Sequence, residues 1–225
     1  MAKLLRKEPM ADDLNYLAVI LCGGPAPHPK AIERIPASSK LIAVDSGFDH
    51  GRAFDLEPDL IIGDLDSISS EGLRWAKERG IKIKKFPEDK DKSDLELALD
   101  QTRGVSKSVF VLGSDTGRFD HTLGVISALG FAAPYFESCH AIIGTSYCTF
   151  ISKSQKLYRS NGTRVSVFAL GGTAVGVTMQ GFQWELQKAD MPSGSTIGLS
   201  NELTSEVGTI TVDGGVLVAI QPETI

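Results

Sequence analysis

Apolar residues in the first part of the chain form short runs that are separated by stretches with helical spacing. Runs such as 60–62 and 109–112 are continuously apolar, which is typical of strands covered on both faces. The pattern predicts five strands, at 16–22, 40–44, 59–63, 81–86 and 108–113. Because helical stretches alternate with these strands, we expect a mostly parallel, Rossmann-like sheet with helices on both faces.

Three helices are expected between and after these strands. Ser70 is the predicted cap of the first, which stops at Gly80. Ser93 and Glu96 have the spacing of a capping box, in which side chain and backbone at a helix start satisfy each other. That second helix ends near Gly104, and the third covers 121–131.

The pattern changes from about residue 139 onward, where β-branched residues, Gly and Thr replace the helix signals. Asn161-Gly162 and Asp213-Gly214 are typical of two-residue hairpin turns. Strands are predicted at 165–169, 173–179, 209–212 and 216–220. This pattern favours an antiparallel β-sandwich. We therefore expect two domains, an α/β domain over 1–137 and a β-sandwich domain over 138–225.

Composition excludes several classes of protein. The 225 residues carry 28 acidic and 23 basic side chains, a net charge of −5, which argues against a nucleic-acid binder. No apolar run reaches the ~18 residues of a membrane span, and the first residues do not have the pattern of a secretory leader. The three cysteines have no metal-ligand spacing and favour reduced thiols, so we expect a cytoplasmic protein. Walker-type and dinucleotide-binding glycine motifs are absent from the sequence.

Carboxylates follow the predicted parallel strands repeatedly. Each of the last four strands is followed by one or more of them, namely Asp45; Asp64 and Asp66; Asp89, Asp91 and Asp94; and Asp115 and Asp120. A single aspartate in a loop is usually a turn or cap residue. Ligands of open α/β sheets bind beyond the carboxyl ends of the strands, so repetition along this edge indicates a functional site.

Asp64 and Asp66 are two positions apart, and in an extended chain such side chains point the same way. Both could then reach one ion, and hard oxygen ligands favour Mg²⁺. An Asx turn at the strand end is an equally good interpretation. Asp94 is either a favourable charge in the first helical turn or a third ligand of the same ion.

The loop 113–121 contains Gly117 and joins a strand to a helix, a setting in which backbone N–H groups bind phosphate. Arg118 can bind phosphate through two hydrogen bonds, or it can pair with Asp120 as the helix N-cap. Lys90 and Lys92 either contact phosphate or are solvated. For His121 a structural role is favoured over that of a general base.

Together these motifs resemble those of the thiamin pyrophosphokinase family in order and spacing. The matching segments are 45–47, 63–67, 89–94, 117–121 and 200–202, and 181–186 is similar to the family's glycine–tryptophan segment. The resemblance extends from about residue 18 to residue 221. Leu65 and Ser93 depart from the usual Phe and common Thr, and Gly124-Val125-Ile126 lacks an Asn often found there. None of these departures removes a charge needed for metal binding.

The resemblance implies a nucleotide-binding catalytic domain followed by a thiamin-binding β-sandwich, in a homodimer with active sites at the interface. It implies transfer of a diphosphate from ATP to the hydroxyl of thiamin, which gives thiamin diphosphate and AMP. The implied Mg²⁺ ligands are Asp64, Asp66 and Asp94, which with Arg118 and Asp120 form the catalytic set. The implied nucleotide site comprises Asp45, Ser93, Gly117, Arg118 and Asp120.

Ser200, Asn201 and Trp184 are the implied thiamin contacts. Trp184 can stack on the positive thiazolium ring, or it can simply pack in the core. No general base is assigned, and Asp94 and Asp120 are the candidates. A metal-dependent phosphohydrolase would share the carboxylates but release phosphate without an acceptor. A catalytically silent nucleotide- or thiamin-binding module would bind without turnover.

Overall fold

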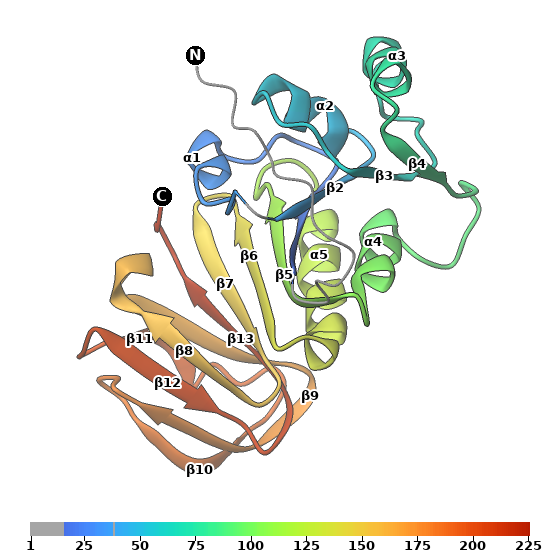
Figure 1. The fold of residues 1–225 in the computed structure, drawn as a ribbon. Coiled ribbons are helices and arrows are strands. Elements are labelled where there is room, and N and C mark those ends of the chain that lie inside the picture. The colour runs from blue at the N-terminus through green and yellow to red at the C-terminus, as the bar shows by residue number, and fades with distance from the viewer. Residues whose placement is uncertain (1–15, 38) are drawn as a thin grey trace. The chain divides into compact units, whose positions relative to one another are not determined.

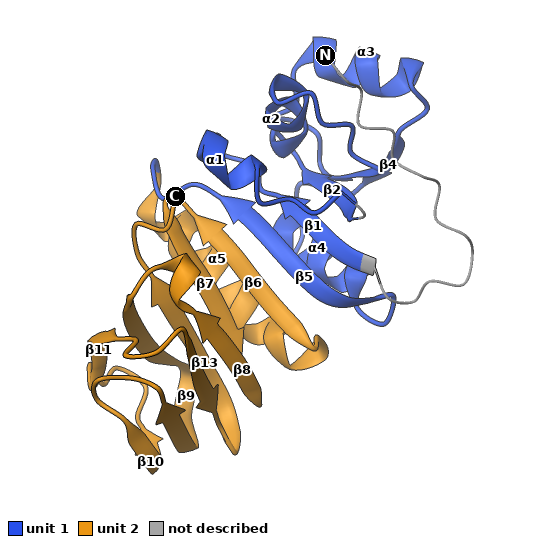
Figure 2. Cartoon of the chain, turned by 60° about the vertical axis from the view of Figure 1, so that its left-hand side comes forward, with its two compact units in different colours: residues 1–117 blue, residues 118–225 orange. Residues whose placement is uncertain are grey.

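The computed structural model describes residues 16–37 and 39–225 (Figure 1). The chain forms two compact units, Met1–Gly117 and Arg118–Ile225 (Figure 2). Its fold is mixed α/β, with parallel strand pairs in the first unit and antiparallel pairs in the second. None of the described helices is long and apolar enough to cross a membrane. The prediction about a secretory leader rests in part on positions before 16, which lie outside the described residues.

Five parallel strands form the sheet of the first unit. They are β1 (Tyr16–Leu21), β2 (Lys40–Val44), β3 (Leu60–Gly63), β4 (Lys82–Lys85) and β5 (Ser106–Gly113). β1 pairs with β2 and β5, β2 also pairs with β3, and β3 with β4. The predicted strands are confirmed with shifts of one or two residues. Four successive residues of β1 and of β5, 18–21 and 109–112, are buried, as expected for strands covered on both faces.

In the described part of the first unit, four helices accompany this sheet: α1 (Pro29–Ile32), α2 (Gly47–Ala53), α3 (Ser70–Glu78) and α4 (Asp94–Thr102). Figure 1 shows α2 and α4 on opposite sides of the sheet. This follows from the topology, because the connection from β4 to β5 runs back across the sheet and right-handed crossovers then change face. α1 and α2 were not predicted, since both are short and have weak periodicity.

The capping box that begins α4 is confirmed. Ser93 Oγ accepts a hydrogen bond from Glu96 N at 3.3 Å, and Ser93 N donates to Glu96 Oε2 at 3.2 Å. The predicted cap of α3 is wrong by one residue. Ser69, with extended backbone, accepts a hydrogen bond from Gly72 N at 2.9 Å, while Ser70 is already helical. Two adjacent serines offer the same side chain for capping, so only the backbone conformation decides which one is the N-cap of α3.

The second unit begins with α5 (Phe119–Ala132) and the 3₁₀ turn η1 (Ala133–Tyr135). The remaining elements are β6 (Ser138–Ile143), β7 (Ser146–Ile151), β8 (Ser154–Tyr158), the 3₁₀ turn η2 (Arg159–Asn161), β9 (Arg164–Gln180), β10 (Leu186–Met191), β11 (Gly198–Glu202), β12 (Val207–Thr211) and β13 (Gly214–Gln221). β6 pairs with β7, β7 with β13, and β13 with β9, all antiparallel. A buried apolar cluster that includes Val167, Val177 and Leu217 fills this unit.

β9 is one strand of 17 residues where the sequence predicts two. Its first half pairs mainly with β13 and β11, and its second half pairs with β12 and β10. Gly171 and Gly176 have φ of 71° and 66°, which lets the strand bend without being interrupted. These two glycines are therefore positions of curvature inside one strand.

Both predicted hairpin turns are wrong. β8 pairs with β12 and not with β9, so Asn161-Gly162 does not close a hairpin. β12 pairs with β8 and β9, and β9 lies between β12 and β13, so Asp213-Gly214 does not close one either. Turn residues indicate where a chain reverses, but long-range packing selects the partner strand.

The compact units divide at Gly117/Arg118, twenty residues before the predicted domain boundary. α5 accounts for this difference because it packs within the second unit. A Cβ atom placed on Gly130 would lie 2.7 Å from Leu170 Cδ1 of β9, so the helix lies tightly on that strand. The division at 137/138 stays a prediction.

Candidate active site

Four aspartates gather at the carboxyl ends of β2 and β3 and at the start of α4. We call Asp45, Asp64, Asp66 and Asp94 the acidic cluster. The Lys90 ammonium lies 3.6 Å from Asp64 Oδ2 and 3.2 Å from Asp94 Oδ1. Asp45 interacts electrostatically with both Asp94 and Asp64, and Asp66 interacts with Asp64. The structure therefore brings together carboxylates that follow three different strands, as the sequence predicts.

Asp45 has a backbone conformation that is uncommon for a residue with a side chain, with φ of 45°. Its Oδ1 atom accepts a hydrogen bond from Leu65 N at 3.3 Å. The carboxylate lies directly on Gly63, whose φ is 148°. A Cβ atom on Gly63 would be 1.7 Å from Asp45 Oδ1, so a glycine is required at this position.

Asp64 and Asp66 do not lie on an extended chain. Leu65 between them has φ of 70°, and Asp64 Oδ1 accepts a hydrogen bond from Asp66 N at 3.1 Å. The extended geometry is wrong, and the alternative of an Asx turn is confirmed. The two side chains nevertheless interact, because a hydrogen bond with Asp64 and its negative charge raise the pKa of Asp66.

Lys90 is a member of the site. The sequence did not decide whether its side chain contacts phosphate or is solvated. Its side chain is 14% exposed, and its ammonium also donates to Pro87 O at 2.9 Å. Burial disfavours the charged ammonium, but Asp94, Asp64 and Asp45 outweigh this and raise the pKa of Lys90. Asp94 Oδ1 is buried and accepts no hydrogen bond, so its contact with Lys90 is an ion pair only.

Burial raises the pKa of Asp45 from its ordinary 3.8 to about 7, with the negative charges of Asp94 and Asp64 adding to the effect. Between these two values the folded chain keeps a proton that the unfolded chain has lost. The contribution of Asp45 to the free energy of unfolding therefore falls as pH rises from about 4 to about 7. Above pH 7 the full penalty of its buried charge is present.

Asp45→Asn should accordingly stabilise the protein more at pH 8 than at pH 5. The amide keeps the acceptor oxygen for Leu65 N and removes the charge. Urea unfolding at both pH values in metal-free buffer measures the difference. Asp115→Asn, which changes an exposed carboxylate outside the acidic cluster, is the control for the substitution itself. An equal effect of Asp45→Asn at both pH values would contradict the assignment.

The donor set of the acidic cluster fits a hard cation, although no centre is formed in the chain alone. Among residues 16–37 and 39–225, no three His, Cys, Asp or Glu side chains converge closely enough to define a metal centre. The Lys90 ammonium lies between two of the candidate ligands instead. Carboxylate oxygens, one of them buried and without a hydrogen-bond partner, suit Mg²⁺.

A cleft of about 680 Å³ opens beside Asp64 and Asp66. Its walls include the apolar side chains of Leu73 and Phe86 and the cationic side chains of Lys77 and Lys85. These two lysines were not predicted, since a lysine on a helix or an edge strand carries no pattern that separates binding from solvation. A cleft lined by both carboxylates and ammonium groups can hold a metal-bound polyphosphate.

Arg118 and Asp120 belong to the second unit. Arg118 is the N-cap residue of α5, and its guanidinium binds Asp120 through two contacts, Nε to Oδ1 at 3.2 Å and a terminal nitrogen to Oδ2 at 2.5 Å. The pairing alternative is confirmed, but Asp120 is not the N-cap. This pair raises the pKa of Arg118 and lowers that of Asp120. Both side chains, like that of His121, are exposed.

The remaining aspartates that follow the parallel strands are not part of the acidic cluster. Asp89, Asp91 and Asp115 are exposed. Gly117 has φ of 87°, and a Cβ atom there would lie 2.9 Å from Pro25 Cγ. Gly117 therefore lets the chain turn sharply where the first unit ends.

Trp184 is 57% exposed, so the core-packing alternative is wrong. Asn201 of β11 is buried and holds the backbone of Trp184. Its Oδ1 accepts from Trp184 N at 3.1 Å, and its Nδ2 donates to Trp184 O at 2.7 Å. Ser200 is exposed, has φ of 59° and donates its N–H to Ser166 Oγ. Asn201 thus positions a loop that presents the indole to solvent.

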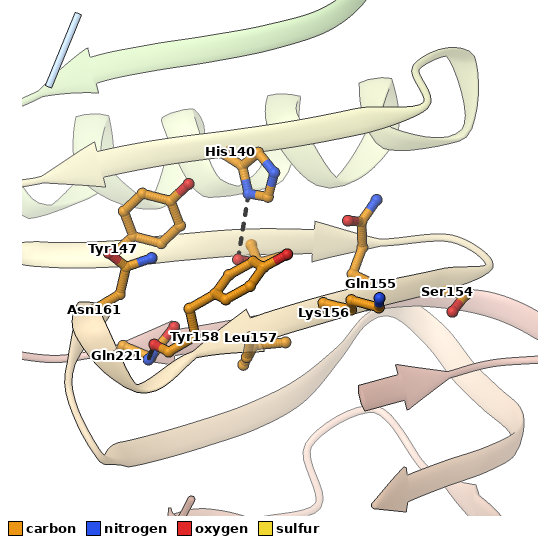
Figure 3. A pocket seen from close by; sticks show the side chains of 10 residues that line it. His140, Tyr147, Ser154, Gln155, Lys156, Leu157, Tyr158, Asn161 and Gln221 are labelled. Atoms are coloured by element: carbon orange, nitrogen blue, oxygen red, sulfur yellow. Dashed lines mark hydrogen bonds between the residues drawn. The ribbon is translucent and has the colours of Figure 1, made fainter. Parts of the chain in front are cut away.

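A second cleft, of about 400 Å³, lies in the second unit (Figure 3). His140 and Tyr147 line it with their rings 5.5 Å apart, and burial lowers the pKa of His140 to about 4. Gln221 also lines it, but its amide donates to Tyr158 O and Gly162 O and so serves the fold. None of the predicted site residues lines this cleft.

Comparisons with known proteins agree on one family. Residues 33–143 match the model for the thiamin pyrophosphokinase catalytic domain, and 145–217 match that for its vitamin B1 binding domain. Thiamine pyrophosphokinase 1 of rice is 28% identical over 178 residues, which are 73% of this chain and 66% of that protein. Thiamine pyrophosphokinase of Bacillus subtilis is 26% identical over 78% of this chain and 85% of that protein.

Solved structures show the same fold. The crystal structure of the Bacillus subtilis thiamine pyrophosphokinase superposes with a TM-score of 0.79 at 24% identity, covering 92% of this chain and 98% of that one. The yeast thiamin pyrophosphokinase structure gives 0.71 at 15% identity, covering 98% and 89%. The chain spans about two thirds of the length of the plant relatives it matches. With both family models matched in order over most of its length, the chain belongs to the thiamin pyrophosphokinase family.

Proposed function

We propose that this protein transfers the diphosphate of ATP to the hydroxyl of thiamin, yielding thiamin diphosphate and AMP. The observation that carries the proposal is the acidic cluster, which lies at the carboxyl edge of the parallel sheet inside the segment that matches the catalytic-domain model. A hard-cation site at this edge suits phosphoryl-type transfer, in which positioning and charge neutralisation supply most of the rate.

The proposal assigns the units separate tasks. We propose a Rossmann-like nucleotide-binding domain over 1–137 and a thiamin-binding β-sandwich over 138–225. Parallel pairing of all strands in the first unit and antiparallel pairing in the second support this layout. We also propose a homodimer with active sites at the interface. Three free, buried cysteines suit the reducing cytoplasm.

Asp64, Asp66 and Asp94 would hold Mg²⁺, which when bound supplies positive charge against the phosphates. In the transfer, the thiamin hydroxyl oxygen bonds to the β-phosphorus while the bond from that phosphorus to the oxygen of the α-phosphate breaks. The hydroxyl proton leaves to a base, for which Asp94 and Asp120 are the candidates. AMP departs with the bridging oxygen.

The cationic and backbone groups of the chain position the polyphosphate in this proposal. Lys77 and Lys85 add positive charge to the cleft beside Asp64 and Asp66. Arg118 has the planar guanidinium that binds phosphate as it now binds Asp120. Asp45, Ser93 and Gly117 complete the proposed nucleotide site. Ser200, Asn201 and Trp184 form the proposed thiamin pocket, with the indole stacked on the cationic thiazolium.

A product assay with ATP, Mg²⁺ and thiamin, with each omitted in turn, tests the function. Equal amounts of AMP and thiamin diphosphate, formed only when all three are present, are expected. ADP with thiamin monophosphate would mean ordinary kinase chemistry. Phosphate released without thiamin would identify a hydrolase, and thiamin binding without turnover would identify a silent module.

Trp184→Ala should raise the KM for thiamin by about 2- to 30-fold and leave the KM for ATP unchanged, because a cation–π contact contributes ~0.5–2 kcal/mol. Steady-state kinetics with each substrate varied measure both constants. The fold should persist because the indole is exposed. Trp184→Phe keeps an aromatic face and should restore most of the affinity. A larger change in the KM for ATP than for thiamin would place Trp184 on the nucleotide side.

A further inference from the structure

One ammonium group forms ion pairs with two members of the acidic cluster. Lys90 Nζ contacts both Asp64 and Asp94, and these are the ion pairs that the described part of the chain shows for either carboxylate. All three side chains are about 15% exposed. Lys92, two residues away, lies 2.6 Å from Asp100 instead, and its side chain is 50% exposed. The two lysines of this loop therefore have different surroundings.

The position of Lys90 is incompatible with a metal on the same oxygens. The Lys90 ammonium lies 3.2 Å from Asp94 and 3.6 Å from Asp64. Its single positive charge only partly offsets the negative charge of the two carboxylates. Mg²⁺ needs oxygen ligands at about 2.0–2.1 Å, and its two charges would repel an ammonium group in the same place. Asp94 Oδ1 gives up no hydrogen bond when the lysine leaves, because it has none.

The lysine has the freedom to leave. It lies in the loop between β4, which ends at Lys85, and α4, which begins at Asp94. Its four-carbon stem ends in a compact charge whose donors are not confined to one plane. Its hydrogen bond to Pro87 O is within its own loop, so movement of the ammonium breaks no hydrogen bond to another helix or strand apart from its two contacts with carboxylates.

We propose that Lys90 is a displaceable counter-ion, which holds Asp64 and Asp94 together before the metal binds and then pairs with the incoming polyphosphate. The inference rests on the proposed function, because it assumes that the metal enters with ATP. Lys90 is then a positioning residue that pairs first with the carboxylates and afterwards with the polyphosphate. In this role Lys90 also makes the nucleotide-free enzyme a poor binder of free metal, so that metal and nucleotide favour each other's binding.

Two binding measurements on the full chain test this role. Mn²⁺ alone is titrated by electron paramagnetic resonance, and a non-hydrolysable ATP analogue is titrated calorimetrically with Mg²⁺ present. Lys90→Met should bind Mn²⁺ alone about 10-fold more tightly, because a competing charge is gone. The same variant should bind the analogue with Mg²⁺ about 10-fold more weakly, because a phosphate partner is gone. Lys92→Met is the matched control and should change neither constant.

The outcomes separate this inference from the proposed function. Equal or weaker Mn²⁺ binding by Lys90→Met than by the unmodified chain would overturn the counter-ion role, while product formation in the omission assay would still support the function. No Mn²⁺ binding by either chain would overturn both the counter-ion role and the metal site. Lys90→Gln, which keeps a polar group in the loop, serves if Lys90→Met does not fold, and the same increase in Mn²⁺ affinity is expected.

Discussion

Turnover by Asp94→Asn should be lower by about 10³-fold or more, with the protein still folded. Asp94 is the member of the acidic cluster that begins α4, and its buried Oδ1 accepts no hydrogen bond from the chain. An amide of the same shape cannot supply the negative charge of the third carboxylate in the proposed metal site. Helix α4 should still form, because Ser93 and Glu96 make the capping box without Asp94.

The matched control for this prediction is Asp100→Asn on the same helix. Asp100 pairs with Lys92 and Arg103, outside the acidic cluster. Its replacement should change turnover by less than about 3-fold, since partly exposed ion pairs contribute about 0–1 kcal/mol. Product formation at saturating Mg²⁺ and thermal unfolding are measured for both variants. If Asp94→Asn retains more than a tenth of the activity, Asp94 is not a ligand of the catalytic metal.

Gly63→Ala should lower the free energy of unfolding by about 2–4 kcal/mol, the largest stability effect we expect from a single methyl group. Two causes act together. The φ of 148° is a conformation that L side chains rarely adopt, and the new Cβ would lie 1.7 Å from Asp45 Oδ1 and 2.5 Å from Asp45 Cγ. Relief of the clash requires Asp45 to move, which breaks its hydrogen bond from Leu65 N.

A double-mutant cycle with Asp45→Ala separates the two causes. Asp45→Ala removes the clashing atoms but leaves the backbone strain, so Gly63→Ala should cost less in that background. Gly124→Ala is the control for the methyl group itself. Gly124 is an exposed glycine inside α5 with open space around its Cα, and alanine there should stabilise by about 0.5–1 kcal/mol. If urea unfolding shows Gly63→Ala to be as harmless as Gly124→Ala, the close approach of Asp45 to Gly63 is contradicted.

Local signals predicted those parts of the molecule that depend on neighbours in sequence. Continuous apolar runs located strands such as β3 and β5, because burial on both faces leaves no polar position in such a run. The capping box at Ser93 was predicted because both partners lie within one helical turn. The gathering of Asp45, Asp64 and Asp94 was predicted because parallel strands have their carboxyl ends at one edge.

Features that depend on distant partners were missed or predicted wrongly. The hairpin at 161–162 failed because β12 lies between β8 and β9, and the hairpin at 213–214 failed because β9 lies between β12 and β13. The core-packing alternative for Trp184 failed because Asn201, on another strand, holds its backbone in an exposed loop. The ion pairs of Lys90 have no sequence signature, since a lysine in an acidic loop is indistinguishable from a solvated one until the strands are assembled.

The sequence by itself thus determined the positions of the five parallel strands, the edge of the sheet where the chemistry lies and the kind of ion its carboxylates suit. Tertiary structure alone decided which strand pairs with which in the second unit, that α5 packs with that unit, and that Lys90 lies between Asp64 and Asp94. The physical reason is the range of the interactions. Periodicity and capping act over a few residues, whereas strand pairing and charge neutralisation join residues that only the folded chain brings together.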